Sequence, residues 1–143
     1  MLRAVLDTNV FVSGLKSQNT APGQIIDVWM KKRFTVVTSP QLLAEIYEVL
    51  MRPAILGLLK KTPDEVNKFI KLLLQKTFVT EGKLETDVLK NDPDDNMVLA
   101  AALEGQATYL VTGNTKHFPF AEYQGVKILK PQEFVAILNK EEN

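Results

Sequence analysis

The sequence predicts an α/β fold around a mostly parallel β-sheet of about five strands. Short runs of apolar and β-branched residues recur along the chain, and longer segments with helical periodicity separate them. This alternation is typical of βα units, in which a helix carries the chain back so that the next strand runs parallel. No linker, repeat or low-complexity tract divides the 143 residues, so we expect one domain spanning residues 1–143.

Five segments have the composition of short strands, and capping residues mark the helices between them. The strands are expected at residues 2–6, 34–38, 78–80, 109–112 and 126–129. Ser39 before Pro40 predicts a helix to about residue 51, and a capping box from Thr62 to Glu65 begins one to about residue 76. Gly105 is expected to end a helix over residues 92–104 in a left-handed C-cap. Further helices are expected over residues 22–32 and from residue 131.

The composition narrows the class of protein. Seventeen basic and seventeen acidic side chains cancel, so no overall positive field indicates a nucleic-acid partner, although a local basic groove would give the same total. The absence of cysteine excludes disulfides, thiolate nucleophiles and the usual structural zinc sites. No signal peptide and no run of about 20 apolar residues is found, so we expect a soluble, cytoplasmic protein with no membrane contact.

Asp7 directly follows the first predicted strand and is the first candidate functional residue. Ligands of open α/β sheets bind at the carboxyl ends of the strands. A carboxylate in this place is either a metal ligand or catalytic group, or a turn-forming residue whose side chain accepts from the next backbone amides. Taken alone, Asp7 fits both interpretations.

Glu45 is the second candidate, because of its place on the helix that starts at Ser39. At about 100° per residue, Glu48 points away from the apolar face, whereas Glu45 lies beside Leu42 and Val49 at the edge of that face. Charged groups seldom occupy such a place unless they are paired or bind a metal. An interhelical salt bridge, or a side chain that reaches out to water, would explain Glu45 as well.

Three carboxylates at the start of a later helix supply the third candidate. Capping and the helix dipole explain Asp92 and Asp94, but Asp95 precedes Val98 and Leu99 at helical spacing and so begins the buried face. The N-termini of such helices lie at the same sheet edge as the strand ends, which places Asp95 near Asp7. Three converging carboxylates without matching cations need a metal ion such as Mg²⁺ or Mn²⁺, an arrangement typical of phosphoryl transfer.

The same residues carry a resemblance to a known family. The chain resembles a PIN-domain ribonuclease, in particular the VapC-like toxin component of a toxin–antitoxin pair. Four motifs in sequence carry the resemblance and cover nearly the whole chain: Val5-Leu6-Asp7-Thr8-Asn9-Val10, Ser39-Pro40 leading to Glu45, Asp92-Pro93-Asp94-Asp95-Asn96 with the following Val98-Leu99-Ala100-Ala101-Ala102, and Tyr109-Leu110-Val111-Thr112-Gly113-Asn114.

The resemblance implies a three-layer α/β/α fold, an acidic pocket that binds Mg²⁺ or Mn²⁺, and hydrolysis of RNA phosphodiester bonds. It places Asp7, Glu45 and Asp95 at the principal acidic positions. It also implies a small antitoxin protein as partner and a homodimer. Polar residues that orient the acids by hydrogen bonds are, by the same resemblance, Thr8, Asn9 and Thr112.

The chain departs from the family pattern after the strand at residues 109–112. Many relatives carry a further acid at the position of Asn114 or three residues on, where this chain has His117. An amide oxygen can bind a metal but adds no charge, which leaves a second metal in question, and Asp92 or Asp94 would be the compensating acids. His117 could contact a phosphate or shuttle a proton, or it is surface structure.

Three functional alternatives stay open beside the metal-dependent endoribonuclease. A phosphatase with an aspartate nucleophile usually has a second acid two residues after the first, where this chain has Asn9. A receiver-like phosphoacceptor domain needs a lysine after its last strand, and none closes the site here. A PIN-like binding module without activity, acting through a protein or RNA partner, would agree with the neutral Asn114.

Overall fold

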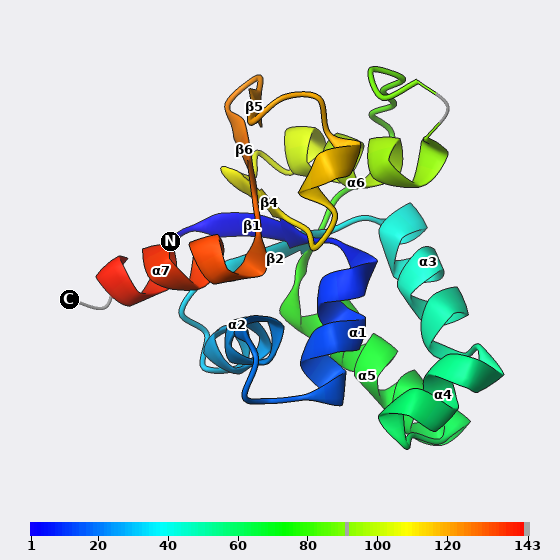
Figure 1. Ribbon diagram of the computed structural model, residues 1–143. Helices are drawn as coiled ribbons and strands as arrows, with labels where there is room; N and C mark the ends of the chain where they lie inside the picture. The colour runs from blue at the N-terminus through cyan, green and yellow to red at the C-terminus, as the bar shows by residue number, and fades with distance from the viewer. Residues whose placement is uncertain (91, 142–143) are drawn as a thin grey trace.

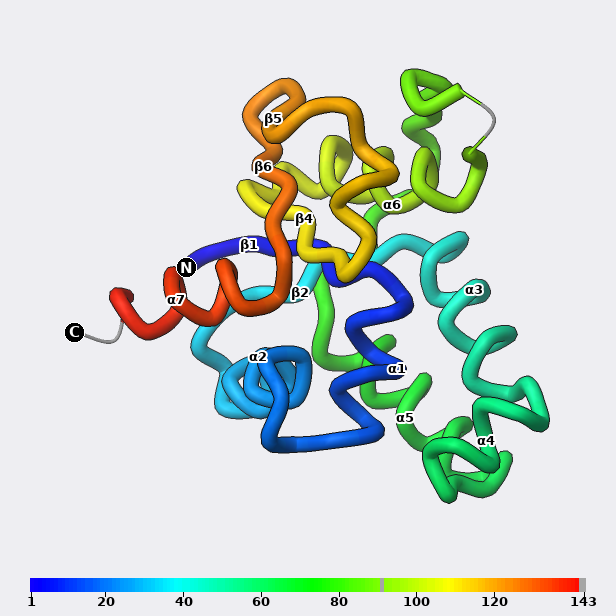
Figure 2. Tube along the Cα trace, viewed as in Figure 1, coloured from blue at the N-terminus to red at the C-terminus, as the bar shows by residue number. Residues whose placement is uncertain are grey.

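The computed structural model describes residues 1–90 and 92–141 and shows helices on both sides of a six-stranded sheet (Figures 1 and 2). The strand order is β3-β2-β1-β4-β6-β5, and the first five strands of this order run parallel. The predicted α/β fold with a mostly parallel sheet is therefore confirmed. The strands are β1 (Arg3–Leu6), β2 (Thr35–Thr38), β3 (Phe78–Val79), β4 (Tyr109–Val111), β5 (Glu122–Tyr123) and β6 (Val126–Leu129).

The helices divide between the two faces of the sheet. Figure 1 shows α6 on one side and α1, α2 and α5 on the other, with α3 beside α1; α6 packs directly on β1, β2 and β4. The helices are α1 (Thr8–Lys16), α2 (Ala21–Met30), α3 (Pro40–Leu50), α4 (Pro53–Leu59), α5 (Pro63–Lys76), α6 (Pro93–Glu104) and α7 (Pro131–Glu141), with a 3₁₀ turn η1 at Thr115–His117. Within the described residues, no helix is long and apolar enough to cross a membrane.

The strand order determines where a ligand can bind. From β1 the chain moves outward through β2 to β3, and α6 then carries it back across the sheet to β4. The direction of winding reverses between β1 and β4, and the crevice at the carboxyl ends of such a strand pair is the usual ligand site of an open α/β sheet. Asp7 follows β1 and Thr112 follows β4, so both residues lie at this reversal.

Most predicted helix starts are confirmed in atomic detail. The side chain of Ser39 accepts from the amide of Leu42 at 3.0 Å, and Asp92 accepts from the amide of Asp95 at 3.2 Å. Thr62 forms the predicted capping box with the third residue of α5. These caps satisfy backbone donors that have no partner inside the helix, which explains why the helices begin at these residues.

Gly105 ends α6 as predicted, but the predicted left-handed conformation is wrong. Its φ is −83°, and the left-handed residue is the next one, Gln106, with φ 53°. Glycine is needed at position 105 for a close approach instead: a Cβ there would collide with Cγ1 of Val37 in β2 and lie 3.1 Å from the carbonyl oxygen of Ala101. The missing side chain thus lets the end of α6 pack tightly on the sheet.

Strand β5 and helices α1 and α4 lie outside the predicted set of strands and helices. Strand β5 is a sixth, antiparallel strand, which a tight turn joins to β6; Gln124 (φ 48°) and Gly125 (φ 86°) form that turn, the left-handed pair favoured in two-residue hairpins. Helix α1 starts directly after β1, where Asp7 is its N-cap. The second unpredicted helix is α4, between α3 and α5.

Candidate metal centre

A polar cavity of about 370 Å³ opens at the carboxyl edge of β1 and β4. Five segments of the chain meet there: the end of β1, α1, α3, the first turn of α6, and the segment that follows β4. None of the described residues that line it is a lysine or an arginine. The lining residues are Asp7, Thr8, Asn9, Val12, Ser13, Glu45, Val49, Asp92, Asp94, Asp95, Asn114 and His117.

Asp7 is buried at one side of this cavity and is held by three hydrogen-bond donors. Its Oδ1 accepts from the backbone amide of Thr8 at 2.8 Å. Its Oδ2 accepts from Oγ1 of Thr112 at 2.8 Å and from the side-chain amide of Asn9 at 3.2 Å. The turn-forming role considered for Asp7 is therefore present, as the N-cap of α1, and it leaves the carboxylate at the cavity.

Further hydrogen bonds join the ends of β1 and β4 into one polar network. The side-chain oxygen of Asn9 accepts from the amide of Gly113 at 2.9 Å, and Oγ1 of Thr112 accepts from the amide of Asn114 at 3.0 Å. Thr112 is fully buried, so its position is set by the strand, while Asn114 is exposed at the cavity mouth. The three polar residues named by the family resemblance thus each donate a hydrogen bond to a candidate acid. Thr8 donates to Glu45, and both Asn9 and Thr112 donate to Asp7.

Glu45 reaches the cavity from α3 and is half-buried. The hydroxyl of Thr8 donates to its Oε2, which links α3 to the first residue of α1. Three residues further along the same helix, Glu48 is exposed and pairs with Arg52 at 2.9 Å on the outside of the molecule. The predicted contrast in exposure between the two glutamates is confirmed.

Asp95 lies at the start of α6 with its side chain against η1. Only 6% of the residue is exposed, which confirms its predicted place on the buried face. Its Oδ2 is 3.0 Å from Nδ1 of His117, and Oδ2 of Asp92 is 4.0 Å from the same nitrogen. Asp94 is exposed but also lines the cavity.

The cavity disfavours negative charge on its acids. Desolvation by burial raises the pKa of Asp7 and of Glu45. Desolvation also raises the pKa of Asp95 to about 7, and a hydrogen bond and the charge of Asp92 add to this effect. The hydrogen bond to Asp95 conversely lowers the pKa of Asp92. Carboxylates in this state are stabilised in their charged form by a cation.

The donor set fits a hard divalent metal ion. Carboxylate oxygens come from Asp7, Glu45 and Asp95, which lie on three elements far apart in the sequence, and no nearby ammonium or guanidinium group in the described lining neutralises them. Oxygen ligands of this kind suit Mg²⁺ and Mn²⁺. The residues present can therefore hold the ion that the family resemblance implies.

The contact between His117 and Asp95 was not predictable from the sequence. A lone loop histidine carries no periodicity, and the contact depends on how the 3₁₀ turn after β4 folds back over α6. The ligand atoms of Asp92, Asp95 and His117 all lie within 4.8 Å of one another. The signal in the sequence was the position of His117, three residues after Asn114, where the family resemblance implies a further acid.

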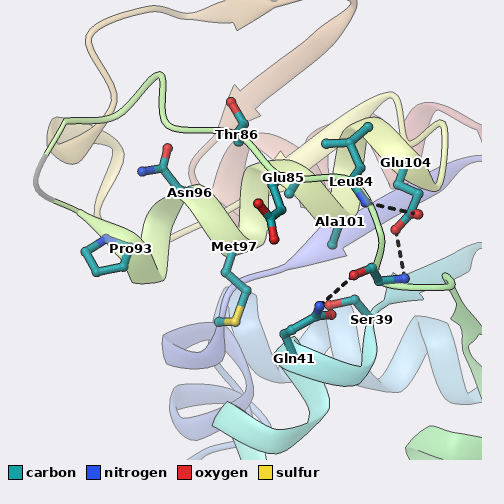
Figure 3. Close-up of a pocket in the computed structure, with 12 residues that line it drawn as sticks. Ser39, Gln41, Leu84, Glu85, Thr86, Pro93, Asn96, Met97, Ala101 and Glu104 are labelled. Carbon is teal, nitrogen blue, oxygen red and sulfur yellow. Dashed lines mark hydrogen bonds between the residues drawn. The ribbon is translucent and has the colours of Figure 1, made fainter.

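A second cavity, of about 400 Å³, lies between the start of α3, α6 and the segment that joins β3 to α6 (Figure 3). Glu104 accepts from the backbone amides of Gly82, Lys83 and Leu84 at 3.0–3.3 Å, and the side chain of Gln41 donates to the carbonyl of Gly82 at 2.7 Å. The Glu104 carboxylate is thus engaged with the backbone of this segment, and its role is to fasten the segment to α6.

The chain belongs to the PIN domain family, whose profile matches residues 3–116. It is 31% identical over 116 residues to the uncharacterized protein MJ1680 of Methanocaldococcus jannaschii, an overlap that covers 79% of this chain and 71% of that protein. PIN domains are in general nucleases and typically use divalent metals. The matched region contains Asp7, Glu45 and Asp95.

A solved structure shows the same fold. A chain of VapBC2 from Rickettsia felis, crystallised bound to a DNA fragment from their promoter, superposes with a TM-score of 0.60. The superposition covers 90% of this chain and 98% of that chain, at 18% sequence identity. This likeness supports the three-layer α/β/α arrangement seen in Figure 1.

Proposed function

We propose that this protein is a Mg²⁺- or Mn²⁺-dependent endoribonuclease that hydrolyses RNA phosphodiester bonds. The observation that carries the proposal is the meeting of Asp7, Glu45 and Asp95 in one cavity at the reversal of the sheet, each with a raised pKa. Burying three acids together lowers stability, and a divalent ion that binds them would offset this cost. Membership of the PIN domain family supports the same conclusion.

In this proposal the three acids together bind the ion. Asp7 would be the central ligand, and Glu45 and Asp95 would hold the ion directly or through water. A bound divalent ion would supply an activated water and would stabilise the charge that develops on the phosphate. Thr8, Asn9 and Thr112 hold the acids in place through the hydrogen bonds described above.

The test is RNA cleavage with Mg²⁺ or Mn²⁺ by the native protein and by single variants. Asp7→Asn and Glu45→Gln should lose activity by roughly 100-fold or more, since each removes a metal ligand. Glu48→Gln is the matched control, because it makes the same change on α3 at an exposed position away from the cavity, and it should cleave like the native protein. Equal cleavage by the native protein and Asp7→Asn would overturn the proposal.

A PIN-like binding module without activity is the second candidate function. Asn114 favours it, because this exposed residue at the cavity mouth adds no charge where relatives can have an acid. Calorimetric titration separates the two candidates. Binding of Mn²⁺ that is lost in Asp7→Asn supports the nuclease, and no heat of binding up to millimolar Mn²⁺ supports the module.

We also propose that the protein acts in the cytoplasm as the toxin of a toxin–antitoxin pair, with residues 1–143 forming one domain. The fold likeness to a chain of VapBC2 supports a small antitoxin partner, and a homodimer follows by family resemblance. The antitoxin would cover the acidic cavity or the apolar surface beside it. Co-expression with the product of the adjacent gene should give a complex that no longer cleaves RNA, and cleavage by a stable complex would contradict this placement.

A further inference from the structure

His117 is the single histidine of the chain, and its ring lies at the acidic cavity. Its Nδ1 is 3.0 Å from Oδ2 of Asp95 and 4.0 Å from Oδ2 of Asp92. About half of the side chain is exposed, so the ring borders both the solvent and the buried acid. An ion can therefore reach the space between these three groups without rearrangement of the core.

The spacing of the three groups suits ligands of one ion. In an octahedral shell with bonds of about 2.1 Å, neighbouring ligand atoms lie about 3.0 Å apart and opposite ones about 4.2 Å apart. The separations of 3.0 Å and 4.0 Å fall in this range, and all three ligand atoms lie within 4.8 Å of one another. A cation bound by both groups would replace the direct contact between Nδ1 of His117 and Oδ2 of Asp95.

We propose that Asp92, Asp95 and His117 form a mixed carboxylate–imidazole metal site that selects a transition-metal ion such as Mn²⁺ over Mg²⁺. This inference rests on the proposed function, because the site is part of the same cavity, and it adds a ligand of a different chemical type. The family resemblance implies a further acid at the position of Asn114 or of His117. In this site, the imidazole of His117 supplies the metal ligand in place of that acid. Asp92, interpreted above as a helix cap, takes a second role through its Oδ2, since its Oδ1 accepts from the helix.

The selectivity follows from the chemistry of the imidazole nitrogen. Mg²⁺ prefers oxygen ligands throughout and gives up its waters reluctantly. Transition ions accept imidazole readily, with affinity rising from Mn²⁺ to Co²⁺ and Ni²⁺. Imidazole is also neutral, so it adds a bond to the ion without adding the negative charge that a fourth carboxylate would bring. Replacing one oxygen ligand by such a nitrogen therefore lowers the affinity of the site less for Mn²⁺ than for Mg²⁺.

The direct test is pulsed electron paramagnetic resonance of the full-length protein with Mn²⁺, prepared without a polyhistidine tag. A nitrogen ligand couples magnetically to the Mn²⁺ electrons. Replacing the histidine of the medium with ¹⁵N-histidine should then change the coupling pattern. Because the chain has one histidine, such a change assigns the ligand to His117 with no need for a variant.

Calorimetric titration with Mn²⁺ and with Mg²⁺ tests the selectivity. Since even outer partners of metal ligands are worth about 10- to 100-fold in affinity, His117→Gln should weaken Mn²⁺ binding by at least about tenfold. Mg²⁺ binding should change less. His117→Asp, which supplies an oxygen and a charge, should move the preference toward Mg²⁺. Lys116→Gln is the control for a change in the same exposed turn and should bind both ions like the native protein.

The outcomes separate this inference from the proposed function. Mn²⁺ that binds without nitrogen coupling, and with equal affinity in His117→Gln, would overturn the inference and leave the nuclease proposal intact, since Asp7 and Glu45 would still hold the ion. Binding of neither ion by the native protein would overturn both. Nitrogen coupling together with a lowered preference for Mn²⁺ in His117→Gln would establish the mixed site.

Discussion

At Asp7, the cap of a helix and a candidate metal ligand are the same side chain. Its Oδ1 accepts from the amide of Thr8 at the start of α1, and its Oδ2 faces Thr112 and Asn9. Asparagine is as good an N-cap as aspartate, so Asp7→Asn can keep the cap through its one oxygen. It removes the charge and places an amide nitrogen, which cannot accept a hydrogen bond, opposite Thr112 and Asn9. Asp7→Ala would remove both the cap and the charge, and its loss of activity could come from a loosened helix. The amide variant is therefore the informative one.

Thr112 offers a test of how the Asp7 carboxylate is held. Thr112→Val keeps the shape of this fully buried side chain but removes the hydroxyl that donates to Oδ2 of Asp7. We expect RNA cleavage to fall by about 10- to 100-fold, the usual effect of losing a partner that orients a metal ligand. Thr112→Ser, which keeps the hydroxyl, should retain most of the activity. Equal losses in both variants would assign the effect to packing.

Asp95 gives the metal-free protein a pH-dependent stability. Its pKa is raised from 3.8 to about 7 in the folded state. Between these values the folded chain keeps a proton that the unfolded chain has lost. The free energy of unfolding therefore falls as pH rises through this range, and above pH 7 the destabilisation by the charged Asp95 carboxylate is complete. Asp95→Asn removes this destabilisation, because an amide does not ionise.

The measurement is denaturant unfolding in a chelator at pH 5 and pH 8. Asp95→Asn should be more stable than the native protein at pH 8, and the difference should shrink at pH 5, where the native carboxyl is protonated in the fold. Asp94→Asn removes an exposed carboxylate from the same turn of α6 and controls for the loss of charge alone. A native protein that gains stability relative to Asp95→Asn as pH rises would contradict this account.

The sequence could single out three acids of the site and name His117 as a possible addition, but it could not predict that His117 contacts Asp95. Helical geometry alone separates Glu45 from Glu48, and it places Asp95 at the head of a buried face, because these relations repeat every few residues. The contact between Asp95 and His117 joins residues 22 apart through an irregular turn. No local pattern encodes such a contact, so it became visible only in the folded chain.

Among the elements, those with strong local signals were predictable and those formed by packing were not. Ser39, Thr62 and Asp92 each cap a helix as predicted. Helix α1, in contrast, contains Gly14 and several β-branched residues, which disfavour a helix on their own. It forms because its buried face packs on the core next to α2 and α3. Strand β5 has two residues, too few for any periodicity.

Substitution by alanine should have opposite effects on stability at two glycines, one at the end of α6 and one within α4. A Cβ at Gly105 would collide with Val37, so Gly105→Ala should destabilise the protein by about 1–3 kcal/mol. At Gly57, within α4, a Cβ would meet nothing within 4 Å, so Gly57→Ala should stabilise it by roughly 0.5–1 kcal/mol. Denaturant unfolding measures both. Stabilisation by Gly105→Ala would show that the end of α6 can move away from β2.

At the scale of the whole molecule, metal binding should be visible as thermal stability. An ion that binds only the folded chain adds about 2.7 kcal/mol when its concentration is 100 times its dissociation constant. We expect Mn²⁺ to raise the melting temperature of the native protein and a chelator to reverse the rise. The Asp7→Asn/Asp95→Asn double variant should show no rise. An equal rise in both proteins would place the ion outside the cavity.

The two outermost strands of the sheet bear on how copies of this protein can meet. Both β3 and β5 contain only two residues, so each presents very little free backbone to another chain. Exposed strand edges are the usual route by which sheets join into larger sheets or fibres. The short outer strands therefore leave few backbone groups with which another sheet could pair. The proposed homodimer should then form through surfaces other than the strand edges, and mutations that break it should be sought on the helices and loops.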